Sequence, residues 1–113
     1  MDKKLQFNLK FIGTLDNHAI SENTLIQIDK NIQAEVKKID YSGAGFGNGQ
    51  AVIEYLFNVF FVGVPSSLIA TLIYDYILKG KNKFIDEKRE KVIITKEELE
   101  AYIEEIKREK DYL

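Results

Sequence analysis

The chain has 113 residues, of which 45% are hydrophobic and 30% are charged, and its net charge is −2. This composition is typical of one folded domain spanning residues 1–113, and it excludes a largely disordered chain. The slightly acidic balance also gives no general attraction to nucleic acid, so we expect no nucleic-acid partner.

In chain order, the first predicted element is a strand. Hydrophobic and polar side chains alternate over residues 5–11, and this period of two is typical of a half-buried β-strand. Hydrophobic residues then recur at helical spacing and predict a helix over 22–33, capped by Ser21 or Asn23. Residues 35–41 fit either an extension of that helix or a short strand, and we prefer the strand because a glycine-rich turn follows it.

That turn, residues 42–50, holds a glycine at every second position from 43 to 49. Backbone N–H groups between a strand and a helix can bind an anion, so the turn is a candidate phosphate or ligand loop. Its candidate residues are Gly43, Gly45, Gly47, Asn48 and Gly49. Asn48 breaks the dinucleotide-binding glycine pattern, and Gln50-Ala51 replaces the Lys-Ser/Thr of a Walker loop, which favours a plain connector.

Residues 51–78 are strongly apolar, with polar residues at intervals of four. Gln50, Glu54 and Asn58 form one such series, and a second series begins at Ser67. Each series predicts a thin polar stripe on a helix. Because Pro65 interrupts the pattern, we expect two helices, over 50–63 and 66–79, with Ser66 or Ser67 capping the second.

The last third of the chain predicts a hairpin and a helix. Gly80 ends the apolar segment. Phe84 and Ile85 predict a short hairpin, and residues 92–94 predict a buried strand. Thr95 and Glu98 have the spacing of a capping box at the start of a helix. The apolar face of this helix is formed by Leu99, Tyr102, Ile103 and Ile106.

These elements predict an α+β fold of two layers. A small mixed sheet is expected to pack on the apolar helical pair, in the order β-α-β-α-α-β-α.

The apolar pair also suggests a function. Two consecutive helices that are apolar on nearly all sides present more hydrophobic surface than one small sheet covers, and such surface usually marks an interaction site. We therefore expect the chain to bind itself, as a homo-oligomer, or a protein partner. The candidate interface residues are Leu56, Phe57, Phe60, Phe61, Ile69, Leu72, Ile73 and Tyr76.

A membrane is the second candidate partner, because residues 57–74 carry no formal charge and lysines follow them. Glu54 and Asp75 near the ends of the segment disfavour a membrane span. The N-terminus lacks the apolar run of a signal peptide, so we expect a cytoplasmic protein, with association with the inner membrane as the alternative.

The order of elements resembles the small effector-associated domains of bacterial conflict and antiviral systems, of the effector-associated constant component type. The resemblance lies in Gly43-Ala44-Gly45-Phe46-Gly47 ahead of the apolar segment and in the Leu-Ile-Tyr-Asp-Tyr sequence at 72–76. The tryptophan expected near the end of the second helix is missing. The resemblance implies a bacterial module that couples effectors to sensors by protein contacts, and it implies no catalytic residues.

We therefore predict a non-enzymatic interaction or assembly module without a cofactor. The chain has no cysteine, and its single histidine, His18, lies in a polar turn, so neither a thiolate metal site nor a catalytic histidine is expected. Glu54 and Asp75 are interpreted as solvated positions rather than an acid–base pair. The alternatives are a membrane-active effector or toxin that uses 51–78 as a helical hairpin, and a small nucleotide- or ligand-binding domain that uses the glycine loop.

Overall fold

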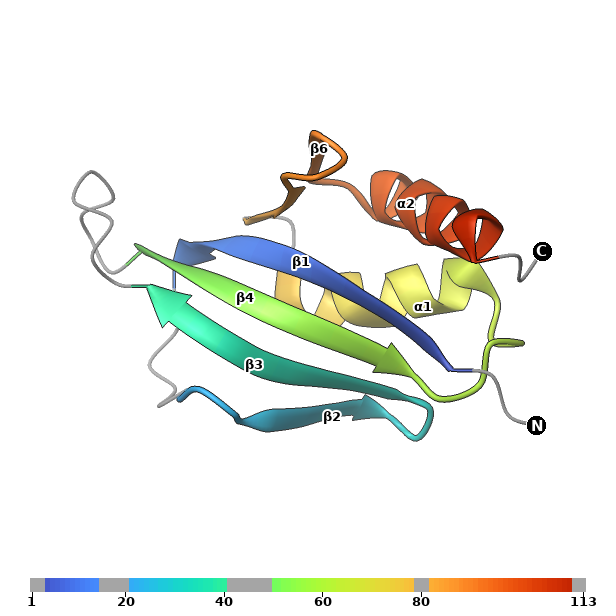
Figure 1. Ribbon diagram of the computed structural model, residues 1–113, viewed down its shortest axis with the longest axis horizontal. Helices are drawn as coiled ribbons and strands as arrows, with labels where there is room; N and C mark the ends of the chain where they lie inside the picture. Colours follow the sequence, from blue (N-terminus) through green and yellow to red (C-terminus); the bar gives the residue numbers. More distant parts are fainter. Residues whose placement is uncertain (1–3, 15–20, 41–49, 79–81, 111–113) are drawn as a thin grey trace.

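The computed structural model is a six-stranded β-sheet with helices packed on one of its faces (Figure 1). It describes residues 4–14, 21–40, 50–78 and 82–110. The elements are β1 (Leu5–Thr14), β2 (Leu25–Asp29), β3 (Ile32–Asp40), β4 (Gln50–Val59), α1 (Ser66–Ile73), the π-helical turn η1 (Tyr74–Leu78), β5 (Lys83–Asp86), β6 (Lys91–Ile93) and α2 (Lys96–Glu109).

The strands lie in the order β2-β3-β4-β1-β5-β6. The two layers confirm the predicted α+β architecture, with a sheet packed on helices. The expected mixture of parallel and antiparallel strands is wrong, because every neighbouring pair is antiparallel. Two segments expected to be helical are strands, and the short turns within β2–β3 and β5–β6 reverse the chain direction in each of these pairs.

β1 and β4 form the centre of the sheet and pair along their whole length, from Leu5 opposite Val59 to Thr14 opposite Gln50. The predicted strand over 5–11 is confirmed and continues to Thr14. Alternate side chains of both strands are buried under the helices, and Phe7 stacks on Phe57 with ring centroids 5.3 Å apart. The buried set is Leu5, Phe7, Leu9, Phe11, Ala51, Ile53, Tyr55, Phe57 and Val59.

The predicted helix over 50–63 is wrong, because this segment is β4 followed by a turn. Polar residues at intervals of four suggested a helical stripe. Four is an even number, however, so Glu54 and Asn58 also share one face of a strand. Residues 52 and 56, which lie between the polar positions, are half-buried on that same face. The period of two, together with the aromatic and β-branched residues of the segment, favours the strand.

The predicted helix over 22–33 is also wrong, because the chain forms the β2–β3 hairpin there. Ile26 and Ile28 pack against the core at a period of two. The turn between the strands is favoured by Asp29, whose Oδ2 accepts a hydrogen bond of 3.3 Å from the backbone N–H of Asn31. The preferred strand over 35–41 is confirmed as far as residue 40 by β3.

The second predicted helix of the apolar segment is confirmed as α1, which continues as η1. Pro65 occupies the N-cap position without a side-chain hydrogen bond, so the expected cap by Ser66 or Ser67 is wrong. The fixed φ of proline suits the start of a helix without such a bond. Gly80, which was expected to end the apolar segment, lies outside the described residues.

The hairpin and the closing helix at the end of the chain are confirmed as β5, β6 and α2. Glu98 donates its backbone N–H to Thr95 Oγ1 at 3.1 Å and accepts the N–H of Thr95 at 2.9 Å, so the capping box is present. Of the strand expected to be buried, only Ile93 is buried, whereas Val92 and Ile94 are each 50% exposed.

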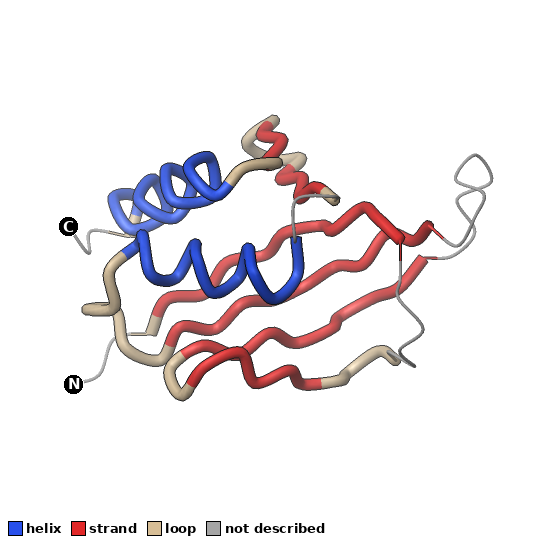
Figure 2. Tube along the Cα trace, turned by 180° about the vertical axis from the view of Figure 1, so that it is seen from behind, coloured by secondary structure: helices blue, strands red, loops and turns tan. Residues whose placement is uncertain are grey.

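Seen from the helical side, α1 and α2 lie next to each other across the same face of the sheet (Figure 2). The four hydrophobic residues expected to face the core from α2 are all buried there. In the described part of the chain, no helix is both long and apolar enough to cross a membrane.

Candidate functional site

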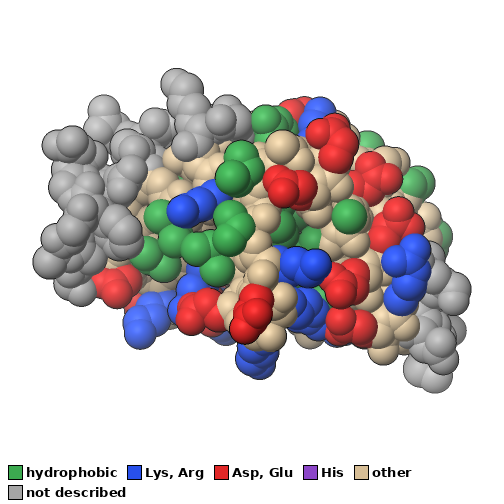
Figure 3. Space-filling model, turned by 90° about the horizontal axis from the view of Figure 1, so that it is seen from above, with side chains coloured by type: hydrophobic (Ala, Val, Ile, Leu, Met, Phe, Trp, Pro, Cys, Tyr) green, Lys and Arg blue, Asp and Glu red, His purple; other side chains and the backbone are tan. Residues whose placement is uncertain are grey.

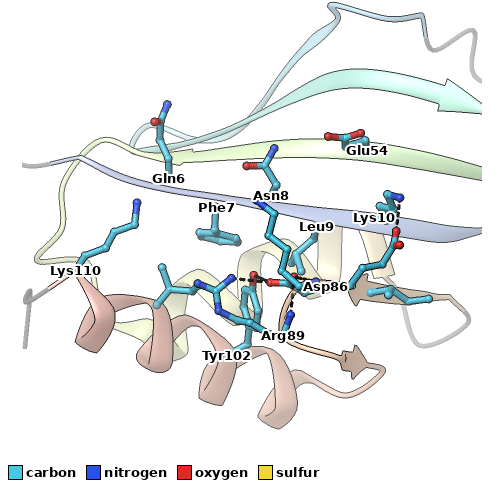
Figure 4. Close-up of a pocket in the computed structure, with 14 residues that line it drawn as sticks. Gln6, Phe7, Asn8, Leu9, Lys10, Glu54, Asp86, Arg89, Tyr102 and Lys110 are labelled. Carbon is cyan, nitrogen blue, oxygen red and sulfur yellow. Dashed lines mark hydrogen bonds and ion pairs between the residues drawn. The ribbon is translucent and has the colours of Figure 1, made fainter.

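A groove of about 600 Å³ lies between β1, the β5–β6 hairpin and α2. In Figure 4, Phe7 points from β1 toward α2, and Tyr102 points from α2 toward the hairpin. Gln6 and Asn8 point away from α2 at the upper rim, and Lys110 closes one end. The groove thus has a polar rim above apolar side chains that are almost fully buried, among them Phe7, Leu9, Tyr102 and Ile106.

One side of the groove is a strand edge. β1 pairs with β4 along its whole length, but β5 pairs only with residues 10–12 of β1. Along residues 5–9, no described strand lies on the side of β1 that faces the groove. Because alternate peptide groups of a strand point to opposite sides, about half of the N–H and C=O groups of this segment point toward the groove.

Residues 5–9 of β1 have no described strand on the groove side because β5 ends at Asp86 and pairs only with residues 10–12. Oδ1 of Asp86, the last residue of β5, accepts the backbone N–H groups of Lys88 and Arg89 at 3.0 and 3.3 Å. These bonds stabilise a turn directly after Asp86. Glu90 completes the reversal with a positive φ of 54°. The hairpin therefore turns back before it can cover the first half of β1.

The other oxygen of Asp86 ties the hairpin to α2. Oδ2 accepts the hydroxyl of Tyr102 at 2.6 Å and Nη1 of Arg89 at 2.9 Å. Burial tends to raise the pKa of Asp86, but these hydrogen bonds outweigh burial and leave the pKa below its ordinary value. Asp86 is therefore an ionised, buried carboxylate with both oxygens engaged.

Arg89 lies along α2 on the wall of the groove. Its guanidinium carbon is 5.9 Å from the centroid of the Tyr102 ring, and its Nη2 and Nε atoms donate to the carboxylate of Glu109. The hydrogen bond to Glu109 is the main reason why the pKa of Arg89 is raised. Hairpin and helix are thus joined by a set of charged hydrogen bonds that hold the groove walls in place.

This chemistry suits binding better than proton transfer. Burial, followed by the hydrogen bond to Asp86, raises the pKa of Tyr102, so the phenol stays protonated at neutral pH. Asp86 has the opposite shift and stays ionised, so neither group is poised near neutral pH as an acid–base catalyst is. Among the described residues, no cluster of three or more His, Cys, Asp or Glu could hold a metal ion.

The rim of the groove carries both signs of charge, and two of the three carboxylates in its lining form ion pairs. Glu87 forms an ion pair with Lys10, and Asp86 pairs with Arg89. Glu54 lies opposite Lys10 across the β1–β4 pair. Viewed from the α2 side, the surface shows acidic and basic side chains interspersed around a smaller hydrophobic group (Figure 3).

Two lysines of the lining differ from these paired groups. The ammonium groups of Lys88 and Lys110 form no ion pair with any residue that the structure describes. The lining carries four basic and three acidic side chains, a small positive excess in a chain whose net charge is −2. Lys110 also has Glu109 as an acidic neighbour, because its charge adds to hydrogen bonding by Arg89 in lowering the pKa of that carboxyl.

The predicted interface residues do not form one surface. Phe57, Ile69 and Ile73 are fully buried core residues, so their assignment to an interface is wrong. Leu56 and Leu72 are half-buried. For Phe57 the reason is the misread helix, because in a strand alternate side chains of this segment face the chain's own core. Ile69 and Ile73 lie on the buried side of α1.

Three of the candidates do reach the surface. Phe60 is 40% exposed, Phe61 is 58% exposed and Tyr76 is half-exposed. Phe60 also lies 5.5 Å from the ammonium of Lys4, measured to the ring centroid. None of the three lines the groove. Their role as an interface stays a prediction.

The candidate ligand loop lies outside the described residues, and so does His18. Its five residues, Gly43, Gly45, Gly47, Asn48 and Gly49, therefore stay a prediction. Glu54 and Asp75 are not brought together: Glu54 lies on β4, and Asp75 is paired with Lys96 at 3.9 Å.

Local patterns in the sequence do not predict the groove. Its residues lie on β1, the hairpin and α2, which are far apart in the chain. A partial signal was present, because the predicted hairpin strand at Phe84-Ile85 is much shorter than the first strand. A ten-residue strand beside a four-residue neighbour must leave part of its edge uncovered.

Comparison of the chain with protein-family models, with curated proteins and with solved structures gave no match. The function is therefore argued from the geometry of the groove.

Proposed function

We propose that this chain is a non-enzymatic protein–protein interaction module that binds a polypeptide partner in the groove beside β1. The observation that carries the proposal is the strand edge of residues 5–9, which borders a groove of about 600 Å³ and has no strand beside it in the described structure. Exposed strand edges pair readily with other chains, and binding modules use them for recognition.

The properties of the groove walls support binding without chemistry. Asp86 is engaged by Tyr102 and Arg89, and Arg89 is engaged further by Glu109. A fixed, hydrogen-bonded wall is preorganised, which lowers the entropic cost of binding a partner.

The predicted coupling of an effector in a bacterial conflict system is compatible with such a module and is kept as a proposal. A module of this kind would bring a sensor or effector into an assembly by holding one of its segments. Self-association through the exposed side chains of Phe60, Phe61 and Tyr76 would add a second contact surface.

The proposal is tested by selecting peptides that bind the free protein and measuring their binding again after the groove is blocked. We call this experiment the blocked-groove selection. The chain has no cysteine, so Lys88→Cys provides a single site at the groove for a bulky maleimide. Random peptides displayed on phage are selected on the unmodified protein and then tested against the labelled variant. We expect a family of peptides whose binding is lost on labelling at position 88.

The matched control carries the same label on Arg108→Cys, at an exposed position of α2 that does not line the groove. Labelling there should leave peptide binding unchanged. If every selected peptide binds the Lys88-labelled protein as well as the control, the groove does not bind polypeptides and the proposed function fails.

A further inference from the structure

We infer that the occupant of the groove is an extended segment of a partner protein that adds a strand to β1 and places acidic side chains beside Lys88 and Lys110. This inference rests on the proposed function and names the partner's chemistry. It combines two features of the same groove, which are the backbone edge and the two lysines that form no ion pair within the described chain.

The backbone edge fixes the conformation of the occupant. Residues 5–9 of β1 present unused N–H and C=O groups at alternate positions, and an extended chain presents the matching groups. At about 3.4 Å per residue, a segment of about five residues covers this edge. It lies in line with β5, which occupies the next part of the same edge at residues 10–12.

The walls fix the side-chain pattern of the occupant. Neighbouring strands point their side chains to the same two faces of a sheet. Residues of the segment opposite Phe7 and Leu9 therefore point to the face of the sheet that carries α2, where Tyr102 and Ile106 line the groove and are themselves almost fully buried. The intervening residues lie beside Gln6 and Asn8 at the rim (Figure 4). We expect apolar side chains at every second position, with polar ones between them.

The charged side chains of the groove determine which charge we expect at the polar positions of the occupant. Glu87 and Asp86 are already paired with Lys10 and Arg89, whereas Lys88 and Lys110 form no ion pair within the described chain. Glu54 also lines the groove without an ion pair in the described structure, but basic side chains outnumber acidic ones in the lining by four to three, so the charge that an incoming segment meets is positive on balance. Complementary charge at a rim speeds association and selects the partner.

A second copy of this chain fits the groove less well than a separate segment. Edge-to-edge pairing of two β1 strands would bring the two α2 helices together, because α2 lies beside the bare edge (Figures 1 and 4). The exposed surface of α2 carries charged side chains, including Glu97 and Arg108. Interface cores are depleted of charged residues, so the helices would oppose such a dimer.

Peptides from the blocked-groove selection test the inference. We expect acidic residues in the selected peptides and, in each peptide, alternation of polar and apolar positions. Lys110→Glu should weaken binding about three- to tenfold, because it replaces an attraction at the rim by a repulsion. Arg108→Glu is the matched control on the same helix turn, outside the groove, and should leave affinity within about twofold.

A scan of single backbone N-methyl groups along a selected peptide tests strand addition directly. N-methylation removes the donor that pairs with β1, so we expect loss of binding at every second position and little effect between them. Hydrogen exchange on the protein should show new protection at groove-facing amides of residues 5–9 when the peptide is bound.

Several outcomes would overturn the inference. Groove-dependent peptides that are neutral or basic, or that ignore Lys110→Glu, contradict the acidic chemistry. An N-methyl scan without a period of two contradicts strand addition. Protection of residues 5–9 that appears on raising the protein concentration without peptide, together with a dimer in light scattering, identifies a second copy as the occupant. In the first two cases the proposed function still stands, because peptides still bind in the groove.

Discussion

At the scale of single residues, Phe57 and Phe61 show why burial depends on the element and not on hydrophobicity alone. On a helix, two residues four positions apart share a face. Here Phe57 is fully buried among Phe7, Tyr55 and Phe84, while Phe61 follows the end of β4 and is 58% exposed. Two residues with equal side chains therefore contribute very differently to the free energy of folding.

Alanine substitution should change the free energy of unfolding by very different amounts at Phe57 and at Phe61. Phe57→Ala removes a ring from a packed core and should lower the free energy of unfolding by about 3–5 kcal/mol. Phe61→Ala removes an exposed ring and should change it by no more than about 0.5 kcal/mol. Urea denaturation followed by circular dichroism measures both variants against the unmodified chain. Equal losses of stability in the two variants would mean that Phe61 is buried, which contradicts the observed fold.

At the scale of elements, the lengths of β1 and β5 determine which residues of β1 have a neighbouring strand on both sides. β1 has ten residues and β5 has four, and Asp86 turns the chain away after the fourth. Residues 10–12 of β1 therefore have strands on both sides, while residues 5–9 have only β4 beside them among the described strands. The groove is the direct result of this mismatch.

Hydrogen exchange of the free protein should reveal the mismatch. Along residues 5–9, amides that bond to β4 should be protected, and the intervening amides that face the groove should exchange at least roughly tenfold faster. β4 is the internal control, because it lies between β1 and β3 and both of its amide sets are paired. Uniform slow exchange along residues 5–9 of the monomer would show that something covers this edge, and the proposed site would then be closed.

At the scale of the whole molecule, carboxylates hold the last third of the chain in place. Hydrogen bonds from Thr95 and Ile94 lower the pKa of Glu98, and hydrogen bonding by Arg89 lowers the pKa of Glu109. The pKa of Asp86 is lowered as well, by hydrogen bonds that outweigh its burial. A carboxyl group with a lowered pKa in the folded state stabilises the fold above its unfolded pKa of about 4 and loses this contribution as pH falls through its folded pKa.

We therefore expect the chain to lose stability below about pH 4, with part of the loss due to Asp86. Tyr102→Phe removes a hydrogen bond to that carboxylate and should lower the free energy of unfolding by about 1.5–3 kcal/mol at neutral pH. The difference from the unmodified chain should shrink as pH falls through the pKa of Asp86. Tyr76→Phe, at an exposed position, is the control. A difference for Tyr102→Phe that is constant from pH 7 to pH 2 would contradict an ionised Asp86.

Much of this architecture could be predicted from local patterns. The alternation over residues 5–11, the break at Pro65 and the capping box of Thr95 and Glu98 each depend on neighbours in sequence, and the strand and helices they predicted are present. The segment over 50–59 was ambiguous because a four-residue spacing fits both a helix and a strand. The groove was beyond such patterns, because it depends on which strands pair and over what length.

The central position of β1 also affects how fast the protein folds. Its first residue, Leu5, pairs with Val59, so the two middle strands meet only after the chain has closed a loop through most of the first half of the sequence. Loops of this kind must be closed before their contacts stabilise anything, and proteins dominated by distant pairings fold slowly. Until β1 pairs with β4, its alternating apolar side chains are exposed to other chains, so this strand is open to misassembly during synthesis.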